Sequence, residues 1–130
     1  MNEETLEIIE IINKALALLH RELLYRETDI ILRENNQKTS YYPTGWGNGY
    51  VALPKGHPLY EEGYDEIHNI CYINVHGGLT YSQMEGDKWV VGFDTCHGGD
   101  TLENWPESAV KAETKSLKEQ LSYIDYRLPF

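Results

Sequence analysis

The amino-acid composition changes abruptly near residue 39, and this change limits the folds open to the chain. Leu, Ile and Glu predominate before that point, whereas glycine, tyrosine and tryptophan are prominent after it. The segment 41–49 holds one proline and three glycines in nine residues, so it cannot form a stable helix. A helical beginning is therefore followed by a middle of different structure, within a length of 130 residues that suits one domain.

Residues 1–35 predict a helical segment. Asn2 is the expected N-cap, and the acidic residues after it lie where the helix dipole favours negative charge. Apolar residues recur every three or four positions as one stripe, which a second row widens: Leu6, Ile9, Ile12, Leu16, Leu19 and Leu23, then Ile8, Ile11, Ala15 and Leu18. A face this wide predicts packing against a substantial surface. The helix is expected to reach about Arg33, either unbroken or with a new turn capped at 28–29.

The segment 39–104 predicts a small antiparallel sheet of four strands. The expected strands are Tyr50–Leu53, Asn69–Val75, Leu79–Met84 and Lys88–Asp94. The sequence Glu85-Gly86-Asp87 favours a hairpin between the last two strands, and Gly77-Gly78 favours another tight reversal.

Residues 105–124 predict a C-terminal helix that begins at Pro106. Its apolar side is expected to hold Ala109, Val110, Ala112, Leu117, Leu121 and Ile124. We therefore expect a single α+β domain of two layers, with a long N-terminal helix and the C-terminal helix both packed against one face of the sheet.

The chain is strongly acidic, with 11 Lys+Arg against 21 Asp+Glu and a net charge of −10. Direct binding to nucleic acid or to an anionic membrane is not expected, because both depend on Lys and Arg. An acidic chain can instead bind proteins that themselves bind nucleic acid. Two distant cysteines indicate no disulfide framework, and no apolar run is long enough to span a bilayer, so we expect a soluble, cytosolic protein.

Metal-capable side chains gather in residues 36–100, which carry four of the five histidines. Three phrases place them at strand ends or beside glycine: Lys55-Gly56-His57-Pro58, Val75-His76-Gly77-Gly78 and Asp94-Thr95-Cys96-His97-Gly98-Gly99-Asp100. Imidazole with carboxylate suits zinc, and neighbouring glycines let the backbone turn closely round an ion. In an antiparallel sheet His76, Asp94 and His97 can meet at one edge, with His57 completing the set. Because the spacing matches no known zinc motif, ordinary hydrogen-bonded loop histidines are the alternative.

Other roles for these residues stay open. Cys96 is an alternative ligand to Asp94, whereas a Cys96–His97 nucleophile is disfavoured because adjacent extended residues point to opposite sides. Asp94 and Asp100 also suit an acid–base pair, or a ligand and its hydrogen-bond partner. His20, in the first helix, and His68 are interpreted as structural or solvated.

Aromatic residues are more numerous than one small core needs, with three tryptophans and ten tyrosines. Some are therefore expected on a binding surface. The glycine-rich segment 45–49 lacks the lysine and hydroxyl residue of a phosphate-binding loop and precedes a strand, so we interpret it as an aromatic turn that anchors the sheet.

Several phrases of the chain resemble a family of small phage and prophage proteins: Asn48–Val51 with Pro54–Pro58, Val75–Ser82 and Trp89–Asp100. The resemblance covers residues 45–124 and leaves the long first helix outside it. Within that group the chain is similar to metal-containing anti-CRISPR proteins, which inhibit the RNA-guided nuclease of type II systems. Carried over position by position, the resemblance implies a zinc site of His57, His76, Asp94 and His97, with Cys96 or Asp100 as alternatives to Asp94.

The resemblance implies an inhibitor that binds a host CRISPR nuclease, with a structural zinc ion at the loop edge of the sheet. Such a nuclease holds nucleic acid in a positively charged channel, which an acidic protein can approach. The candidate contact, unless it is a solvated loop, is formed by Glu61, Glu62, Tyr64, Asp65 and Glu66. Two other functions stay open: zinc-dependent hydrolysis of a small substrate, with Asp100 or Glu103 as base, and sequestration of a nucleotide stacked on Trp46.

Overall fold

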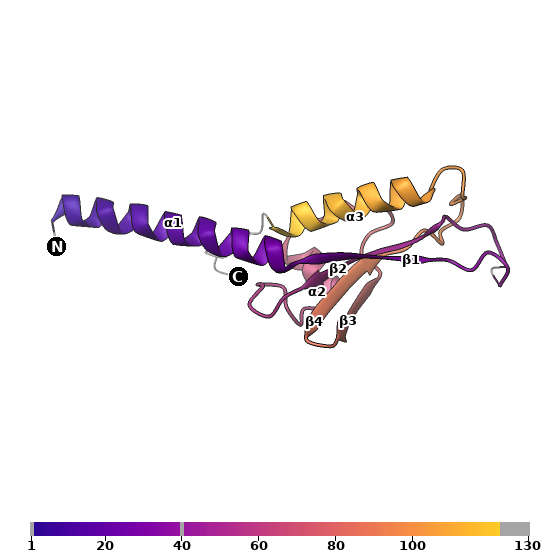
Figure 1. Cartoon of the computed structure of the whole chain (residues 1–130), viewed down its shortest axis with the longest axis horizontal. Helices are drawn as coiled ribbons and strands as arrows, with labels where there is room; N and C mark the ends of the chain where they lie inside the picture. Colours follow the sequence, from indigo (N-terminus) through magenta and orange to yellow (C-terminus); the bar gives the residue numbers. More distant parts are fainter. Residues whose placement is uncertain (1, 40, 123–130) are drawn as a thin grey trace.

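The computed structural model describes residues 2–39 and 41–122, which form an α+β domain with a long helix projecting from one end (Figure 1). The elements are α1 (Glu3–Glu27), β1 (Asp29–Glu34), β2 (Gly47–Leu53), α2 (Tyr64–Ile70), β3 (Tyr81–Glu85), β4 (Lys88–Phe93) and α3 (Glu107–Ser122). The strands form one antiparallel sheet in the order β1-β2-β4-β3. The predicted fold class, a long N-terminal helix, a four-stranded antiparallel sheet and a C-terminal helix, is confirmed.

The first strand of the sheet occupies residues that the sequence predicts as helix. α1 ends at Glu27, where the Thr28 hydroxyl donates to the Leu24 carbonyl at 2.6 Å. Residues 29–34 then pair along the whole length of β2. The helical prediction for residues 29–33 is wrong because this pairing with a distant segment overrides the local apolar pattern.

The predicted strand Asn69–Val75 is also wrong. Its first two residues end α2, and the rest has no regular secondary structure. The backbone of Asn74 pairs with a side chain of α3: its N–H donates to Gln120 Oε1, and its carbonyl accepts from Gln120 Nε2, both at 2.8 Å. Ile73 and Val75 are nevertheless buried. The alternation of apolar and polar residues in this segment therefore indicates which side chains are buried, although the segment does not pair with a strand.

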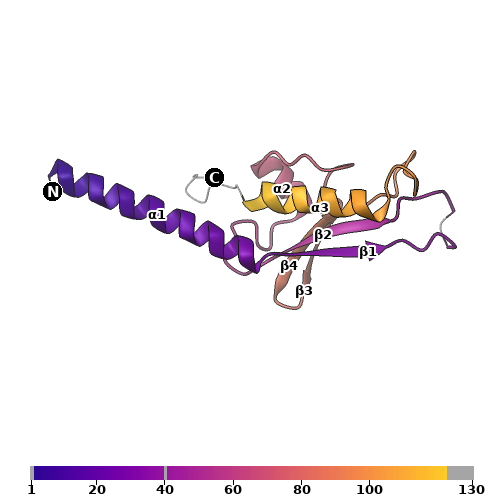
Figure 2. The same cartoon turned by 45° about the horizontal axis from the view of Figure 1, so that its top comes forward.

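The core lies between the central strands and α3, which covers one face of the sheet (Figure 2). It includes Val51, Leu53, Val91 and Phe93 from the strands, and Val110, Leu117 and Leu121 from α3. Close approach of the helix requires Gly49, because a Cβ at that position would overlap the Thr114 hydroxyl. The glycine-rich segment therefore serves packing at this point.

α1 does not pack on the sheet, so the prediction that both helices cover one sheet face is wrong. Of its 25 residues, all of them described, only Leu24 is buried. The helix meets the domain near its C-terminal end, where it approaches α3, and the rest extends outward (Figures 1 and 2). Its predicted apolar stripe is therefore largely exposed. Among the helices described, none has the length and apolar character needed to cross a membrane.

Candidate metal centre

Two loops meet beside the sheet, formed by residues 75–79 and 94–101. The first is a tight turn in which the Gly78 N–H donates to the Val75 carbonyl at 2.9 Å. Gly77 and Gly78 both have positive φ, at 70° and 78°, so the predicted reversal is confirmed. A Cβ on Gly77 would overlap the imidazole of His97, and this glycine therefore lets the two loops touch.

The second loop leaves the end of β4 and is held by its own carboxylates. Asp94 Oδ1 accepts from the Cys96 N–H at 3.0 Å, and Asp94 Oδ2 accepts from the Thr80 hydroxyl at 2.9 Å. Farther along, Asp100 Oδ2 accepts from the His97 N–H at 2.9 Å, and the Asp100 N–H donates to the His97 carbonyl at 3.0 Å. These bonds fix the position of each side chain in the loop.

Together the loops bring His76, His97 and Asp100 into one cluster, whose candidate ligand atoms all lie within 4.8 Å of one another. His76 Nε2 is 2.9 Å from Asp100 Oδ1, and His97 Nδ1 is 3.3 Å from Asp100 Oδ2. The carboxylate is buried, whereas both imidazoles are half-buried. Trp105 lies against His76, with ring centroids 4.3 Å apart, and restricts the orientation of that imidazole.

Of the predicted ligands, His76 and His97 come together, but the cluster is completed by Asp100. Asp94 lies beside it, with Oδ1 3.4 Å from His97 Nδ1, yet both of its oxygens accept hydrogen bonds within the loop region. The sequence left Asp100 open as an alternative to Asp94, and the geometry favours it as the carboxylate of the site.

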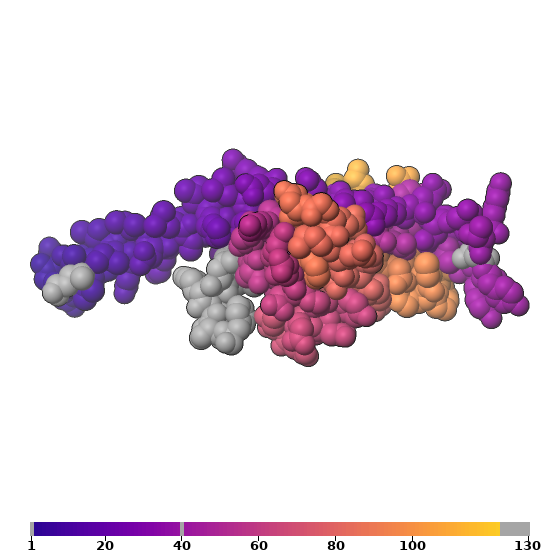
Figure 3. Space-filling view, turned by 90° about the horizontal axis from the view of Figure 1, so that it is seen from below, coloured from indigo at the N-terminus to yellow at the C-terminus, as the bar shows by residue number. Residues whose placement is uncertain are grey.

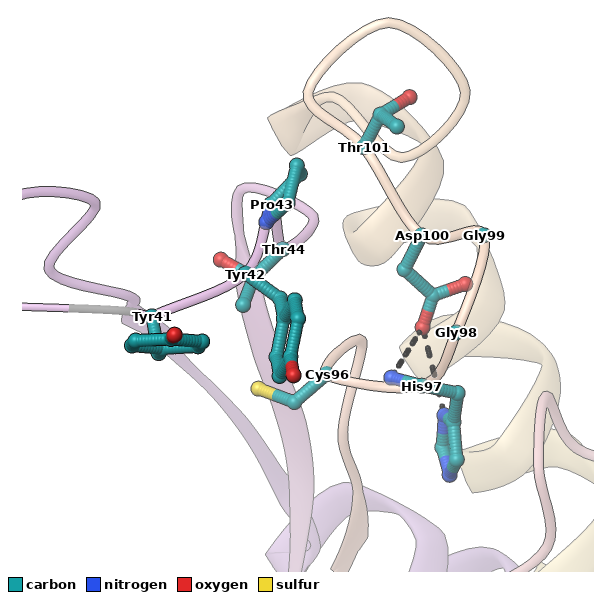
Figure 4. Close-up of a pocket in the computed structure, with 10 residues that line it drawn as sticks. All are labelled: Tyr41, Tyr42, Pro43, Thr44, Cys96, His97, Gly98, Gly99, Asp100 and Thr101. Carbon is teal, nitrogen blue, oxygen red and sulfur yellow. Dashed lines mark hydrogen bonds and ion pairs between the residues drawn. The ribbon is translucent and has the colours of Figure 1, made fainter.

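Cys96, the other alternative ligand, is exposed and points away from the imidazole of His97 (Figure 4). Partial desolvation and the nearby Asp94 carboxylate raise the pKa of its thiol. A thiol that resists ionisation and faces away from its neighbouring histidine is unsuited to the Cys–His nucleophile that the sequence also disfavours.

His57 is not part of the cluster, because its ring is buried and engaged elsewhere. Nε2 lies 3.2 Å from the Leu121 carbonyl, and Nδ1 accepts from the Leu59 N–H at 3.1 Å. These partners assign the neutral tautomer with the proton on Nε2. Burial lowers the pKa of His57 to about 4, although the hydrogen bond to the Leu121 carbonyl acts in the opposite direction. His57 therefore joins a loop to the end of α3 as a structural residue.

His68 and Trp105 support the cluster, but the sequence analysis places neither of them in the predicted site. His68, on α2, accepts from the Leu79 N–H at 3.1 Å and so holds the chain just after the turn of His76. This contact agrees with its interpretation as structural. Trp105 precedes α3 and packs on His76. Neither residue lies in a motif with the histidine it supports, so no local signal could have identified these contacts.

A pocket of about 370 Å³ adjoins the cluster (Figure 4). One wall is formed by Tyr41–Thr44 and the other by Cys96–Thr101, which includes His97 and Asp100. Two imidazoles and one carboxylate form a donor set that suits zinc and also ferrous iron. Three protein ligands leave one position of a tetrahedral zinc ion for water or substrate.

The acidic segment predicted to contact a partner comprises a turn and the start of α2. Tyr64, Asp65 and Glu66 form the first turn of α2, where acidic side chains stabilise the helix N-terminus. They and Glu61 are exposed, whereas Glu62 is half-buried, with its carbonyl accepting from the Trp89 indole at 2.7 Å. The segment therefore presents exposed acidic side chains from the start of a helix and the turn before it.

Comparisons of the chain with models of known families, with curated proteins and with solved structures give no match. The likeness to small phage proteins accordingly rests on the sequence phrases alone. The function must be inferred from the His–Asp cluster, the adjoining pocket and the distribution of charge.

Replacing His57 by Gln is expected to remove part of the pH dependence of stability. Because its folded pKa of about 4 lies below the ordinary 6.5, the unfolded chain takes up the proton first as pH falls. The contribution of His57 is therefore complete above pH 6.5 and declines toward pH 4, by up to about 3 kcal/mol. Urea unfolding across this range should show a shallower decline for His57→Gln than for the parent chain.

The matched control is Asn69→Gln, an exposed substitution in α2 that removes no titratable group and should retain the parent's decline in stability. A His57→Gln chain whose unfolding free energy follows the parent's pH profile would contradict the neutral, buried state of this histidine.

Proposed function

We propose that the protein is a zinc-containing inhibitor that binds a basic partner protein. In this proposal zinc at His76, His97 and Asp100 holds the loops 75–79 and 94–101 together, and the acidic surface of the domain contacts the partner. The observation that carries the proposal is the convergence of two imidazoles and a buried carboxylate within 4.8 Å.

The chemistry of the cluster supports zinc as the ion. Zinc accepts imidazole nitrogen and carboxylate oxygen in sites of three or four protein ligands. Asp100 is buried, so a cation would compensate its charge where water cannot. Because the unfolded chain does not bring the three ligands together, the free energy of metal binding would add directly to folding stability.

Charge and sequence resemblance support the class of partner. A net charge of −10 favours association with a positively charged surface and raises the rate of encounter. RNA-guided nucleases of type II systems hold nucleic acid in such a channel. The exposed acidic residues near the start of α2 provide a candidate contact, and the resemblance to metal-containing anti-CRISPR proteins points to the same kind of target.

The purified chain is expected to carry one zinc ion per chain, measured by inductively coupled plasma mass spectrometry. Removal of zinc by a chelator should lower the melting temperature, since the ion binds only the folded chain. His76→Ala, His97→Ala and Asp100→Asn should each lose the ion. His20→Ala and Asp94→Asn should retain it, because one lies on α1 and the other uses its oxygens within the loop region.

Two outcomes would count against this assignment. A chain without stoichiometric metal, whose melting temperature is the same with and without chelator, would exclude a metal centre. Iron in place of zinc would preserve the site but overturn the identity of the ion.

Binding to the partner is expected to depend on the acidic segment. Lysine substitutions at Glu61, Glu62, Asp65 and Glu66 should lower capture of a type II RNA-guided nuclease by about tenfold or more, because they place like charges together. The same substitutions at Glu27, Asp87, Glu103 and Glu119, which are exposed elsewhere, provide a control of equal charge change. Equal capture of both variants would remove the segment from the interface, and no capture of the parent chain would overturn the inhibitor proposal.

A second candidate function is zinc-dependent hydrolysis of a small substrate, favoured by the three-ligand cluster beside a pocket of about 370 Å³. An open coordination position would admit a small anion, whereas a position closed by the protein would not. Cobalt-substituted protein should therefore change its visible spectrum on addition of azide if this function holds. A spectrum unmoved by azide would exclude it.

A further inference from the structure

The exposed face of α1 has no partner within the domain that the structure describes. Nine large apolar side chains along this helix are 38–66% exposed: Leu6, Ile8, Ile9, Ile11, Ile12, Leu16, Leu18, Leu19 and Leu23. Figure 3 shows the helix extending well beyond the rest of the domain. Monomeric soluble proteins rarely expose a continuous apolar surface of this extent, which marks an interaction site.

The spacing of these residues is that of a helix-pairing seam. Ile9, Ile12, Leu16, Leu19 and Leu23 follow one another at intervals of three, four, three and four residues. This is the spacing that keeps one face of a helix against another helix over several turns. Ile8 flanks the seam, and Ile11 and Leu18 extend the exposed apolar surface farther round the helix.

We propose that α1 pairs with α1 of a second copy of this chain, in antiparallel orientation. The same face then serves both copies, as a two-fold interface requires. An anionic membrane is a poorer occupant, because helices that lie in a membrane surface carry Lys and Arg on their polar face. The first half of α1 carries glutamates there instead.

The distribution of charge along α1 supports the antiparallel orientation. Residues 3–13 carry four glutamates and no Lys or Arg, whereas residues 14–27 carry three cationic and two acidic side chains. Antiparallel pairing places the acidic half of one helix beside the cationic half of the other. Parallel pairing would instead gather the glutamates of both copies at the same end of the pair, which is unfavourable.

The position of the domain supports the same orientation. The folded body lies at the C-terminal end of α1, and the helix of 25 residues extends about 37 Å from end to end (Figures 1 and 3). In an antiparallel pair the two bodies lie at opposite ends and do not collide. In this register Ile12 faces the partner's Leu16, Ile9 faces the partner's Leu19, and Thr5 faces the partner's Leu23.

The state of association is tested on the full chain by sedimentation equilibrium at micromolar concentration. The parent should sediment as two chains, and Ile12→Glu combined with Leu16→Glu should weaken association by about 100-fold or more, because carboxylates would enter an apolar seam. Lys14→Glu is the control, because it changes the charge by the same amount outside the seam. This variant should still sediment as two chains.

A parent chain that sediments as one chain would overturn the proposal and assign the face to another occupant, such as residues 123–130, which lie outside the described part. Association that survives the double substitution would overturn it as well. Because α1 contributes only Leu24 to the buried residues, thermal unfolding should show that the domain of each variant is still folded.

Orientation is tested by cysteine cross-linking in a chain whose native cysteines are replaced, Cys71→Ser and Cys96→Ser. Thr5→Cys mixed with Leu23→Cys should form a disulfide between chains, whereas each variant alone should not. Cross-linking of either variant alone, without the mixed product, would indicate parallel helices and contradict the proposed pair.

Discussion

The organisation of the site depends on the hydrogen bonds made by the buried carboxylate of Asp100. A carboxylate out of contact with water must be compensated, and here the compensation comes from the His97 N–H and from the imidazoles of His76 and His97. Those partners belong to two loops far apart in sequence, so satisfying one charge draws the loops together. A zinc ion bound to these side chains would replace the imidazole–carboxylate hydrogen bonds by metal–ligand bonds that join the same two loops. The proposed inhibitor would then present its acidic surface from a domain held together at this edge.

The fold uses its two long helices in different ways. α3 covers the sheet, supplies buried side chains and bonds the irregular segment 71–75 through Gln120, so the domain is completed without α1. α1 contributes only Leu24 to the buried residues. The apolar seam of α1 is not used in the core of the domain and is therefore available to a second chain. Two copies joined through α1 would carry two metal centres and two acidic surfaces at opposite ends of the pair.

Local signals in the sequence were sufficient for elements that local interactions stabilise. The Asn2 cap accepts from the Thr5 N–H at 2.9 Å as predicted, and the β3–β4 hairpin turns at Gly86. The helical prediction for residues 29–33 and the predicted strand Asn69–Val75 are wrong because distant partners decide the conformation, β2 for residues 29–33 and α3 for Asn74. His57 illustrates the same limit at the site: it lies beside glycine much as His76 does, but the path of the chain directs it toward the end of α3.

Zinc K-edge X-ray absorption on the loaded protein tests the central claim, that His76, His97 and Asp100 form the metal centre, most directly. The account predicts a shell of nitrogen and oxygen ligands at about 2.0–2.1 Å, with scattering from two imidazoles and no sulfur. The two-imidazole signal should stay unchanged in His57→Gln, whereas His97→Ala, which is expected to lose the ion, should give no zinc absorption edge. A sulfur ligand at about 2.3 Å, or an imidazole signal that depends on His57, would contradict it.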